Sequence, residues 1–218
     1  MKTLIGEVPD DWTVADLGDV CDVLAGPSGE LARAVDLTES GVPMLAPKDI
    51  GDGWILEEGS AHVSPETAGR LERYRLTPGD IIGVRTGSIG RYALAGVEHG
   101  GWLFGTACLC IRPKERFDRR YLLHYLRNPA VRDWVRQNSL KSTIHSISRK
   151  TIRSIPLVIP PPSVQESVGG LLAALDDKIA IHKEISLKTA ELRDLLSPLF
   201  LTGSLPRPYG EQLGGDDR

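Results

Sequence analysis

Three consecutive prolines, Pro160–Pro162, divide this chain more sharply than any other feature. An apolar, strand-like run covers Thr151–Ile159 before them. Proline has no amide hydrogen to give to a strand or a helix, so the strand-like Ile155–Ile159 has to end there. Ser163 and Glu166 then have the S-x-x-E spacing of a capping box, which satisfies free amides in the first turn of a helix. The chain is therefore expected to change from strand to helix at this point.

A one-sided apolar stripe continues from Val164 to Phe200 at helical spacing, with charged residues on the other faces. It predicts a long helix that packs against a partner helix, while a helix folded back on its own domain is the alternative. His182 and Ser186 interrupt the stripe and Gly169–Gly170 weaken its first turns, which favours a short bundle. The predicted partner-helix residues are Val168, Leu172, Leu175, Ile179, Ile185, Leu192, Leu196 and Leu199.

Charge is distributed unevenly along the 218 residues, although the net charge is only −3. Residues 1–69 hold three bases and fourteen acids, whereas residues 70–153 hold seventeen bases and six acids. An excess of eleven positive charges in the middle segment indicates an extended anionic partner, and a nucleic-acid backbone is the commonest one. The alternative is that the basic segment pairs with the acidic start of the chain.

Several classes of protein are disfavoured by composition. The first residues carry acids where a secretory leader needs an apolar core, and no apolar run approaches the roughly 20 residues that span a bilayer. We therefore expect a cytoplasmic protein with no membrane association. Cys21, Cys108 and Cys110 lack the spacing of a zinc site and are interpreted as core thiols. The five histidines show no partner arrangement, so neither a metal nor a cofactor is expected.

Short Val/Ile/Tyr-rich runs separated by glycine turns fill residues 76–112 and predict a curved, mostly antiparallel sheet. A strand–turn–strand pattern is expected at 44–56, and a short helix after the cap Ser64 and Pro65. Two further helices are expected at Asp118–Arg127 and Pro129–Asn138, from the spacing of their apolar residues. The fold class is therefore α+β, followed by one long C-terminal helix.

The glycine-rich stretch Gly83–Gly90 lacks the Gly-Lys-Ser/Thr ending of a nucleotide-binding loop. A hairpin whose backbone approaches a ligand is more plausible, because glycine permits close approach and arginine can grip phosphate or a guanine edge. An ordinary turn with surface arginines is the alternative. The candidate DNA-binding residues of this hairpin are Arg85, Thr86, Ser88 and Arg91.

A second candidate stretch, residues 141–150, combines hydroxyls, a histidine and three bases. Such side chains suit phosphate contacts and hydrogen bonds to base edges, although a solvated linker would have a similar composition. The candidate DNA-binding residues here are Lys141, Ser142, Thr143, His145, Arg149 and Lys150.

Sequence motifs for catalysis were not found. The chain has no G-x-S-x-G, no H-E-x-x-H, no protein-kinase set, and no Asp/Asn-Pro-Pro-aromatic tetrad of the kind that amino-methyltransferases use. We therefore expect a protein that recognises rather than reacts, with no catalytic residues.

The order of these motifs is familiar. Five motifs follow one another along the chain: a Pro-Gly-Asp-Ile-Ile turn with Arg85, a Tyr-Leu-Leu-x-Tyr-Leu helix, the run from Ile152 to Pro162, Gln165-Glu166, and Leu175-Asp-Asp-Lys-Ile179. This arrangement resembles the specificity subunit of Type I restriction-modification enzymes over roughly residues 8–200. The junction around the prolines is the most specific part of the resemblance.

The resemblance implies a DNA target-recognition domain at 1–160 and a spacer and dimerisation helix at 161–202, and we expect a disordered tail at 203–218. It also implies methyltransferase (M) subunits that methylate adenine, and a restriction (R) subunit as a possible further partner. Family members usually carry two recognition domains, so this chain is expected to act as a half-subunit. A homodimer through the helix would then read a bipartite, palindromic site on double-stranded DNA.

Other functions remain open from sequence alone. The chain could serve a different modification or defence system, or pair with a different half-subunit. It could also be a protein-interaction scaffold without DNA binding, or an unrecognised enzyme.

Overall fold

The computed structural model of the chain describes residues 1–114, 117–140 and 145–204. Its contacts divide it into two compact units, Met1–Ala173 and Ala174–Arg218. The first unit holds every strand and all helices except the greater part of α7 (Pro162–Leu201), which is continuous across the division. The predicted tail beyond Ser204 lies outside the described residues.

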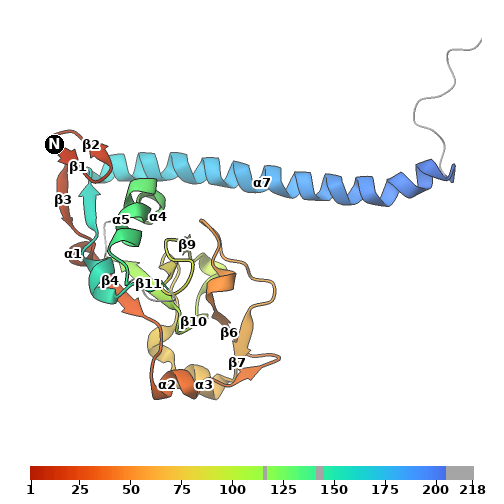
Figure 1. Cartoon of the computed structure of the whole chain (residues 1–218), viewed down its shortest axis with the longest axis horizontal. Helices are drawn as coiled ribbons and strands as arrows, with labels where there is room; N and C mark the ends of the chain where they lie inside the picture. Colours follow the sequence, from red (N-terminus) through yellow and green to blue (C-terminus); the bar gives the residue numbers. More distant parts are fainter. Residues whose placement is uncertain (115–116, 141–144, 205–218) are drawn as a thin grey trace, which may run out of the picture. The chain divides into compact units, whose positions relative to one another are not determined.

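The centre of the first unit is a four-stranded antiparallel sheet in the order β4-β11-β8-β9 (Figure 1). Its strands are rich in β-branched and cysteine side chains, and Ile81–Val84 is buried on both faces. In register, Cys110 of β11 is opposite Leu24 of β4 and Ile82 of β8. The strands are β4 (Cys21–Ala25), β8 (Ile81–Val84), β9 (Tyr92–Leu94) and β11 (Cys108–Pro113).

A second four-stranded sheet has the order β10-β6-β7-β5, and its β10–β6 pair is parallel. It comprises β5 (Leu37–Thr38), β6 (Val42–Leu45), β7 (Ala61–Val63) and β10 (Leu103–Phe104). Two small antiparallel pairs complete the strands: β1 (Lys2–Thr3) with β2 (Gly6–Glu7), and β3 (Thr13–Asp16) with β12 (Pro156–Ile159). The mostly antiparallel α+β prediction is therefore confirmed, although the strands form several sheets.

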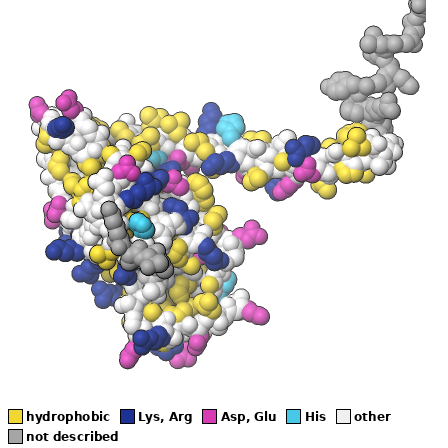
Figure 2. Space-filling view, in the orientation of Figure 1, with side chains coloured by type: hydrophobic (Ala, Val, Ile, Leu, Met, Phe, Trp, Pro, Cys, Tyr) yellow, Lys and Arg dark blue, Asp and Glu magenta, His cyan; other side chains and the backbone are white. Residues whose placement is uncertain are grey.

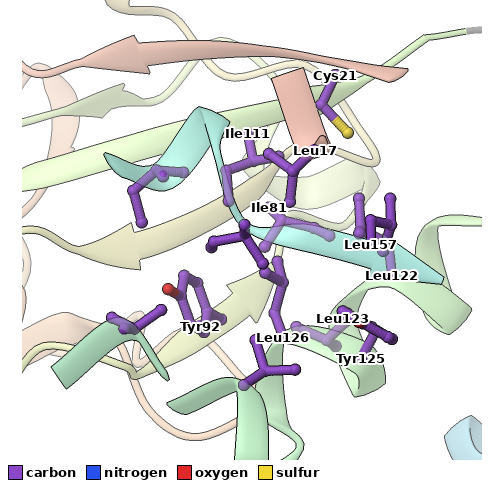
Figure 3. Close-up of a cluster of buried hydrophobic side chains, with 14 of the residues drawn as sticks. Leu17, Cys21, Ile81, Tyr92, Ile111, Leu122, Leu123, Tyr125, Leu126 and Leu157 are labelled. Carbon is purple, nitrogen blue, oxygen red and sulfur yellow. The ribbon is translucent and has the colours of Figure 1, made fainter. Parts of the chain in front are cut away.

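The largest core cluster lies where helices α4 (Arg119–Arg127) and α5 (Pro129–Gln137) pack on the central sheet. Figure 3 shows Leu122 and Leu126 of α4 pointing toward Ile81 of β8, with Leu157 of β12 beside them. All four side chains are fully buried. Both helices were predicted, and each begins at a side-chain cap, since Asp118 accepts from the Tyr121 amide and Asn128 accepts from the Ala130 amide.

The remaining helices are short. Ser64 caps α3 (Pro65–Arg70) as predicted, with its Oγ accepting from the Thr67 amide at 3.1 Å. The others are α1 (Leu17–Val20), α2 (Glu30–Arg33), α6 (Arg149–Arg153) and the 3₁₀ turns η1 (Pro47–Asp49), η2 (Glu72–Tyr74) and η3 (Val97–His99).

Three local predictions were wrong. Residues 54–56 do not form a strand, and only an isolated bridge joins Ile50 to Ile55. Thr151 lies in helix α6 rather than in a strand-like run, because Ser148 caps that turn through the Thr151 amide. Ser163 lies inside α7 instead of capping it: the helix already begins at Pro162, whose fixed φ suits a first helical position.

Helix α7 packs on the first unit through its initial turns. Gln165 is buried, and its side chain accepts from the Asp118 amide at 3.1 Å and donates to the Pro160 carbonyl at 2.8 Å. Gly169 is buried against Asp118 and Tyr121 of the α4 N-terminus. None of the described helices is long and apolar enough to span a membrane.

Candidate nucleic-acid interface

The predicted hairpin is the loop between β8 and β9, residues 85–91, called here the 85–91 loop. Gly87 and Gly90 adopt φ of +91° and +90°, a region that other residues rarely enter, so both glycines are needed for this turn. The Arg91 carbonyl accepts from the Val84 amide at 3.1 Å and closes the loop at its base. The loop therefore has a defined shape set by its backbone.

The second predicted stretch lies directly beside this loop. The Gly87 amide donates to the His145 carbonyl at 2.9 Å, and the Ile147 amide donates to the Arg85 carbonyl at 3.0 Å. A bridge between Thr86 and Ser146 lies between these two bonds. Two stretches more than fifty residues apart in sequence thus form one continuous surface, here called the 85–91/145–150 surface.

Three arginines around the loop have a buried Nε–H with no hydrogen-bond partner among the described residues: Arg85, Arg91 and Arg132. Arg91 is held by bonds from Nη2 to the Ser88 hydroxyl at 2.8 Å and to the Pro47 carbonyl at 2.9 Å. The stem of Arg132 lies beside Gly90 of the loop. The loop is therefore bordered by guanidinium groups, whose positive charge suits an anion-binding surface.

The other predicted residues are distributed as follows. Ser88, His145, Arg149 and Lys150 are exposed, and Thr86 is half-buried. Arg149 and Lys150 form the first turn of α6, immediately after the segment paired with the loop. Lys141, Ser142 and Thr143 lie outside the described residues.

Pairing between the acidic start and the basic middle of the chain is local. Asp52 contacts Arg127, with 3.1 Å between Oδ1 and Nε, and also Arg132. Other arginines of the middle segment pair with acids of the same segment, as Arg112 does with Asp80 and Arg136 with Asp133. Within the described ranges, the acidic start therefore pairs with Arg127 and Arg132, and no ion pair there joins it to an arginine of the 85–91/145–150 surface.

One histidine has acidic neighbours, contrary to the sequence expectation. Among the described residues, Glu57, Glu98 and His99 form the group whose side-chain atoms could approach a metal ion together. The Gly96 amide donates to His99 Nδ1 at 3.0 Å, and Glu98 Oε1 lies 3.1 Å from the same nitrogen. His99 Nε2 lies 3.4 Å from Glu57 Oε1, so both carboxylates border the buried ring.

The cysteines are buried and unpaired, as expected of core thiols. Burial raises the pKa of the Cys21 and Cys108 thiols to about 12, and it raises the pKa of Cys110 as well. These groups are therefore neutral thiols at neutral pH, the form that does not act as a nucleophile.

The predicted partner-helix residues divide into two groups. Val168 packs against the core cluster of the first unit, and Leu172 and Leu196 are half-buried. The others leave 41 to 55% of their surface exposed: Leu175, Ile179, Ile185, Leu192 and Leu199.

Sequence reasoning missed further arginines that lie near Arg149. Four arginines line one groove with it: Arg153 from the same helix, and Arg73, Arg75 and Arg112 from η2, the residue after η2 and β11. The spacing of Arg149 and Arg153 was a usable signal, because residues four apart share a face of a helix. Their helix was not predicted, so that signal was not recognised.

The chain matches a family model described as the Type I restriction modification DNA specificity domain over residues 9–189. A relative from Methanocaldococcus jannaschii, named for the MjaX type I restriction enzyme specificity subunit, is 26% identical over 93% of this chain and 48% of its own length.

Two solved structures share the fold. The HsdS subunit from Thermoanaerobacter tengcongensis has a TM-score of 0.56 at 21% identity, over 87% of this chain and 44% of that one. The S subunit of a type I restriction-modification system from M. genitalium has a TM-score of 0.60 at 13% identity, over 89% of this chain and 47% of that one. The chain thus spans about half the length of the relatives it matches.

Proposed function

This chain belongs to the Type I restriction-modification DNA specificity domain family, and we propose that it recognises the DNA target of an adenine methyltransferase complex. The observation that carries the proposal is the pairing of the 85–91 loop with residues 145–147 inside the matched region. This pairing joins the two stretches whose residue types suit DNA into one surface.

In the proposed interface, arginine and lysine side chains hold phosphates while hydroxyl side chains of the loop approach base edges. Arg85 and Arg91 stand at the two ends of the loop with their positive charges, and Gly87 lets the loop backbone come close to a ligand. Arg149 and Lys150 extend the same surface with exposed positive charge. Lys141, Ser142 and Thr143 belong to the proposal through their sequence position.

The chemistry would be supplied by other subunits. We found no catalytic motif in the sequence, and the cysteines have pKa values too high for a nucleophile. The proposal therefore assigns methylation to methyltransferase (M) subunits and cleavage to a restriction (R) subunit, with this chain as the non-catalytic part that selects the site. It further predicts cytoplasmic localisation, where DNA and these partners are present.

A single recognition unit and a single long helix suggest that two such halves act together. The exposed apolar side chains of α7 are the surface through which we propose a second copy binds. Twofold pairing would present two recognition surfaces and select a bipartite palindrome. A second half supplied by another polypeptide is the competing arrangement.

Co-expression with candidate methyltransferase partners, followed by methylome sequencing, tests the proposed function directly. We expect adenine methylation at one bipartite motif that disappears when this chain is omitted. Methylation that does not depend on this chain would contradict the proposal.

A gel-shift titration tests the proposed surface. Arg85→Ala and Lys141→Ala should each weaken duplex binding while leaving the fold intact, because each removes a charge that contacts DNA. If both variants bind like the parent, the surface has been placed wrongly.

The main competing function is a protein-interaction scaffold whose basic segment has a structural role. Asp52, which pairs with Arg127 and Arg132, is the observation in its favour. A scaffold predicts no duplex binding, whereas DNA recognition predicts binding that weakens steeply with salt. Neighbouring genes for a methyltransferase and a helicase-nuclease would separate a Type I system from another defence system.

A further inference from the structure

A groove of about 600 Å³ lies beside the edge strand β4, and arginines dominate its lining. Helix α6 supplies Arg149 and Arg153, while Arg73, Arg75 and Arg112 come from η2, the residue after it and β11. We call it the arginine groove. In the view of Figure 2, Lys and Arg side chains gather over the region where Figure 1 draws β4.

Arg112 is held rigidly at the groove. Its Nε and Nη2 donate to the two carboxylate oxygens of Asp80 at 2.8 and 2.7 Å, and Asp80 is only 1% exposed. Nη2 also donates to the Arg75 carbonyl at 3.2 Å. The guanidinium is therefore oriented before any ligand arrives, which lowers the entropic cost of binding.

Arg75 and Arg153 are also oriented by hydrogen bonds that their own guanidinium groups donate. Arg75 bonds Glu72 at 2.6 Å and the Gly101 carbonyl at 2.7 Å. Arg153 donates to the Gly18 carbonyl at 3.3 Å and lies so close over Gly18 that a Cβ there would be 2.9 Å from it. A side chain at position 18 would displace Arg153, so glycine is required for this placement.

Arg73 and Arg149 differ, because both are exposed and the described part of the chain offers neither an acidic partner. The three nearby acids are Asp22, Glu72 and Asp80, of which the last two are engaged by Arg75 and Arg112. Five arginines against three carboxylates leave an excess of two positive charges.

The lining excludes several kinds of ligand. Val23 and Leu24 are the members of the lining with apolar side chains, so an apolar ligand or the hydrophobic face of a helix would have to desolvate the neighbouring guanidinium groups without pairing them. Several guanidinium groups in one open groove instead suit a ligand with repeated, planar or tetrahedral anionic groups, which arginine binds with two hydrogen bonds each. A chain of phosphodiesters has this chemistry.

We propose that the arginine groove binds the phosphodiester backbone of duplex DNA next to the bases read by the 85–91 loop. The backbone bond from Ile147 to Arg85 places the residues leading into α6 beside that loop, so one strand of DNA can contact both. This inference rests on the proposed function, because it assumes that the 85–91/145–150 surface faces DNA.

The test is a salt titration of the full-length chain with a fluorescent duplex. The double variant Arg73→Gln/Arg149→Gln removes two exposed positive charges that form no ion pair among the described residues. For two lost phosphate contacts, the slope of log K against log salt should become shallower by roughly 1.8. Arg73→Lys/Arg149→Lys keeps the charge and should keep the slope close to that of the parent.

Lys2→Gln/Arg33→Gln is the matched control, because it removes two exposed positive charges outside the groove. It should leave the slope unchanged. Thermal melting confirms that each variant is folded, and if the double variant is not, either single glutamine variant should still reduce the slope by roughly 0.9.

The outcomes separate the two proposals. A parental slope in the double glutamine variant, with DNA binding intact in the parent, overturns the groove and the DNA contact proposed for Arg149, and it leaves DNA recognition through the 85–91 loop standing. A parent that shows no salt-dependent duplex binding overturns both. A double variant that binds DNA normally but loses its methyltransferase partner would make the groove a protein interface and overturn the inference.

Discussion

Gly169 lies where the first turns of α7 touch the start of α4, and its missing side chain permits that contact. A Cβ at this position would be 2.3 Å from Asp118 Oδ1 and 2.7 Å from the Tyr121 amide nitrogen. Asp118 cannot move away easily, because its Oδ1 caps α4 by accepting from that same amide. From sequence, the two glycines were interpreted as a weakness of the helix, whereas the first of them is a packing requirement.

The substitution Gly169→Ala should therefore destabilise the protein, although alanine favours helices. We expect the free energy of unfolding to fall by about 1–3 kcal/mol, as in other overpacked contacts. Gly170→Ala is the matched control: its nearest neighbour is Arg120 Nη1 at 4.0 Å, so the better helix propensity should stabilise by up to about 1 kcal/mol. Urea unfolding measures the free energy of unfolding of both variants. If both substitutions change it in the same direction, the packing argument is contradicted.

The three buried cysteines lead to a prediction about reactivity. Only a thiolate attacks a disulfide reagent, and burial holds the pKa of Cys21 and Cys108 at about 12. At pH 8 the folded protein should therefore react at a small fraction of the rate seen in guanidinium, where all three thiols of the chain become available. A colorimetric thiol assay with and without denaturant measures this, and rapid reaction of the native protein would show that a thiol is accessible.

At the scale of elements, Gln165 links the Pro160–Pro162 segment, α4 and α7. Its side chain accepts from the Asp118 amide and donates to the Pro160 carbonyl, and only 3% of its surface is exposed. Asp118 in turn caps α4. One buried amide thus fixes the end of the strand segment and the starts of two helices, and the first turns of α7 are a structural part of the recognition unit.

Gln165→Leu keeps the approximate volume but leaves the Asp118 amide and the Pro160 carbonyl without their partner. An unpaired buried group costs about 1–3 kcal/mol, so we expect a loss of about 2–4 kcal/mol in the free energy of unfolding. Gln137→Leu, on the exposed face of α5, should change stability by less than about 0.5 kcal/mol. Similar values for the two variants in chemical denaturation would show that the Gln165 bonds contribute little.

Local patterns predicted some elements well and others poorly. The α3, α4 and α5 helices were recognised because their caps and apolar spacing are encoded within about ten residues. Helix α6 has only five residues, too few for an apolar period, and the sequence pattern there favours a linker followed by a strand. The parallel β10–β6 pair joins Leu103 to Met44, and no local pattern records such a distant contact.

At the scale of the whole molecule, charge segregation was the most informative sequence feature, but it gave no geometry. It indicated that residues 70–153 face an anion, yet it could not show that Arg85 lies beside His145 or that Arg73 and Arg149 share a groove. Those contacts depend on the pairing of segments distant in sequence. The neighbours of individual arginines, such as Asp80 at Arg112, are likewise set by tertiary structure.

Pairing through α7 is the proposal that governs how the complete assembly reads DNA. Ile185 and Leu192 are each 55% exposed, and a second helix packed against α7 would bury their apolar surface. The double variant Ile185→Lys/Leu192→Lys would place charges in that interface, and a buried unpaired charge is costly enough to abolish self-association. Analytical ultracentrifugation at tens of micromolar should therefore show a dimer for the parent and a monomer for the variant.

The control is Leu187→Lys, an equally apolar position that is 66% exposed. At about 100° per residue, position 187 is rotated by about 160° from position 185, so it lies outside the paired face and its substitution should leave the dimer intact. A monomeric parent would refute self-pairing and favour a second half from another polypeptide. A dimer that survives the double substitution but not Leu187→Lys would instead place the interface on the opposite face of α7, and the spacing between the two recognition surfaces would have to be derived again from that face.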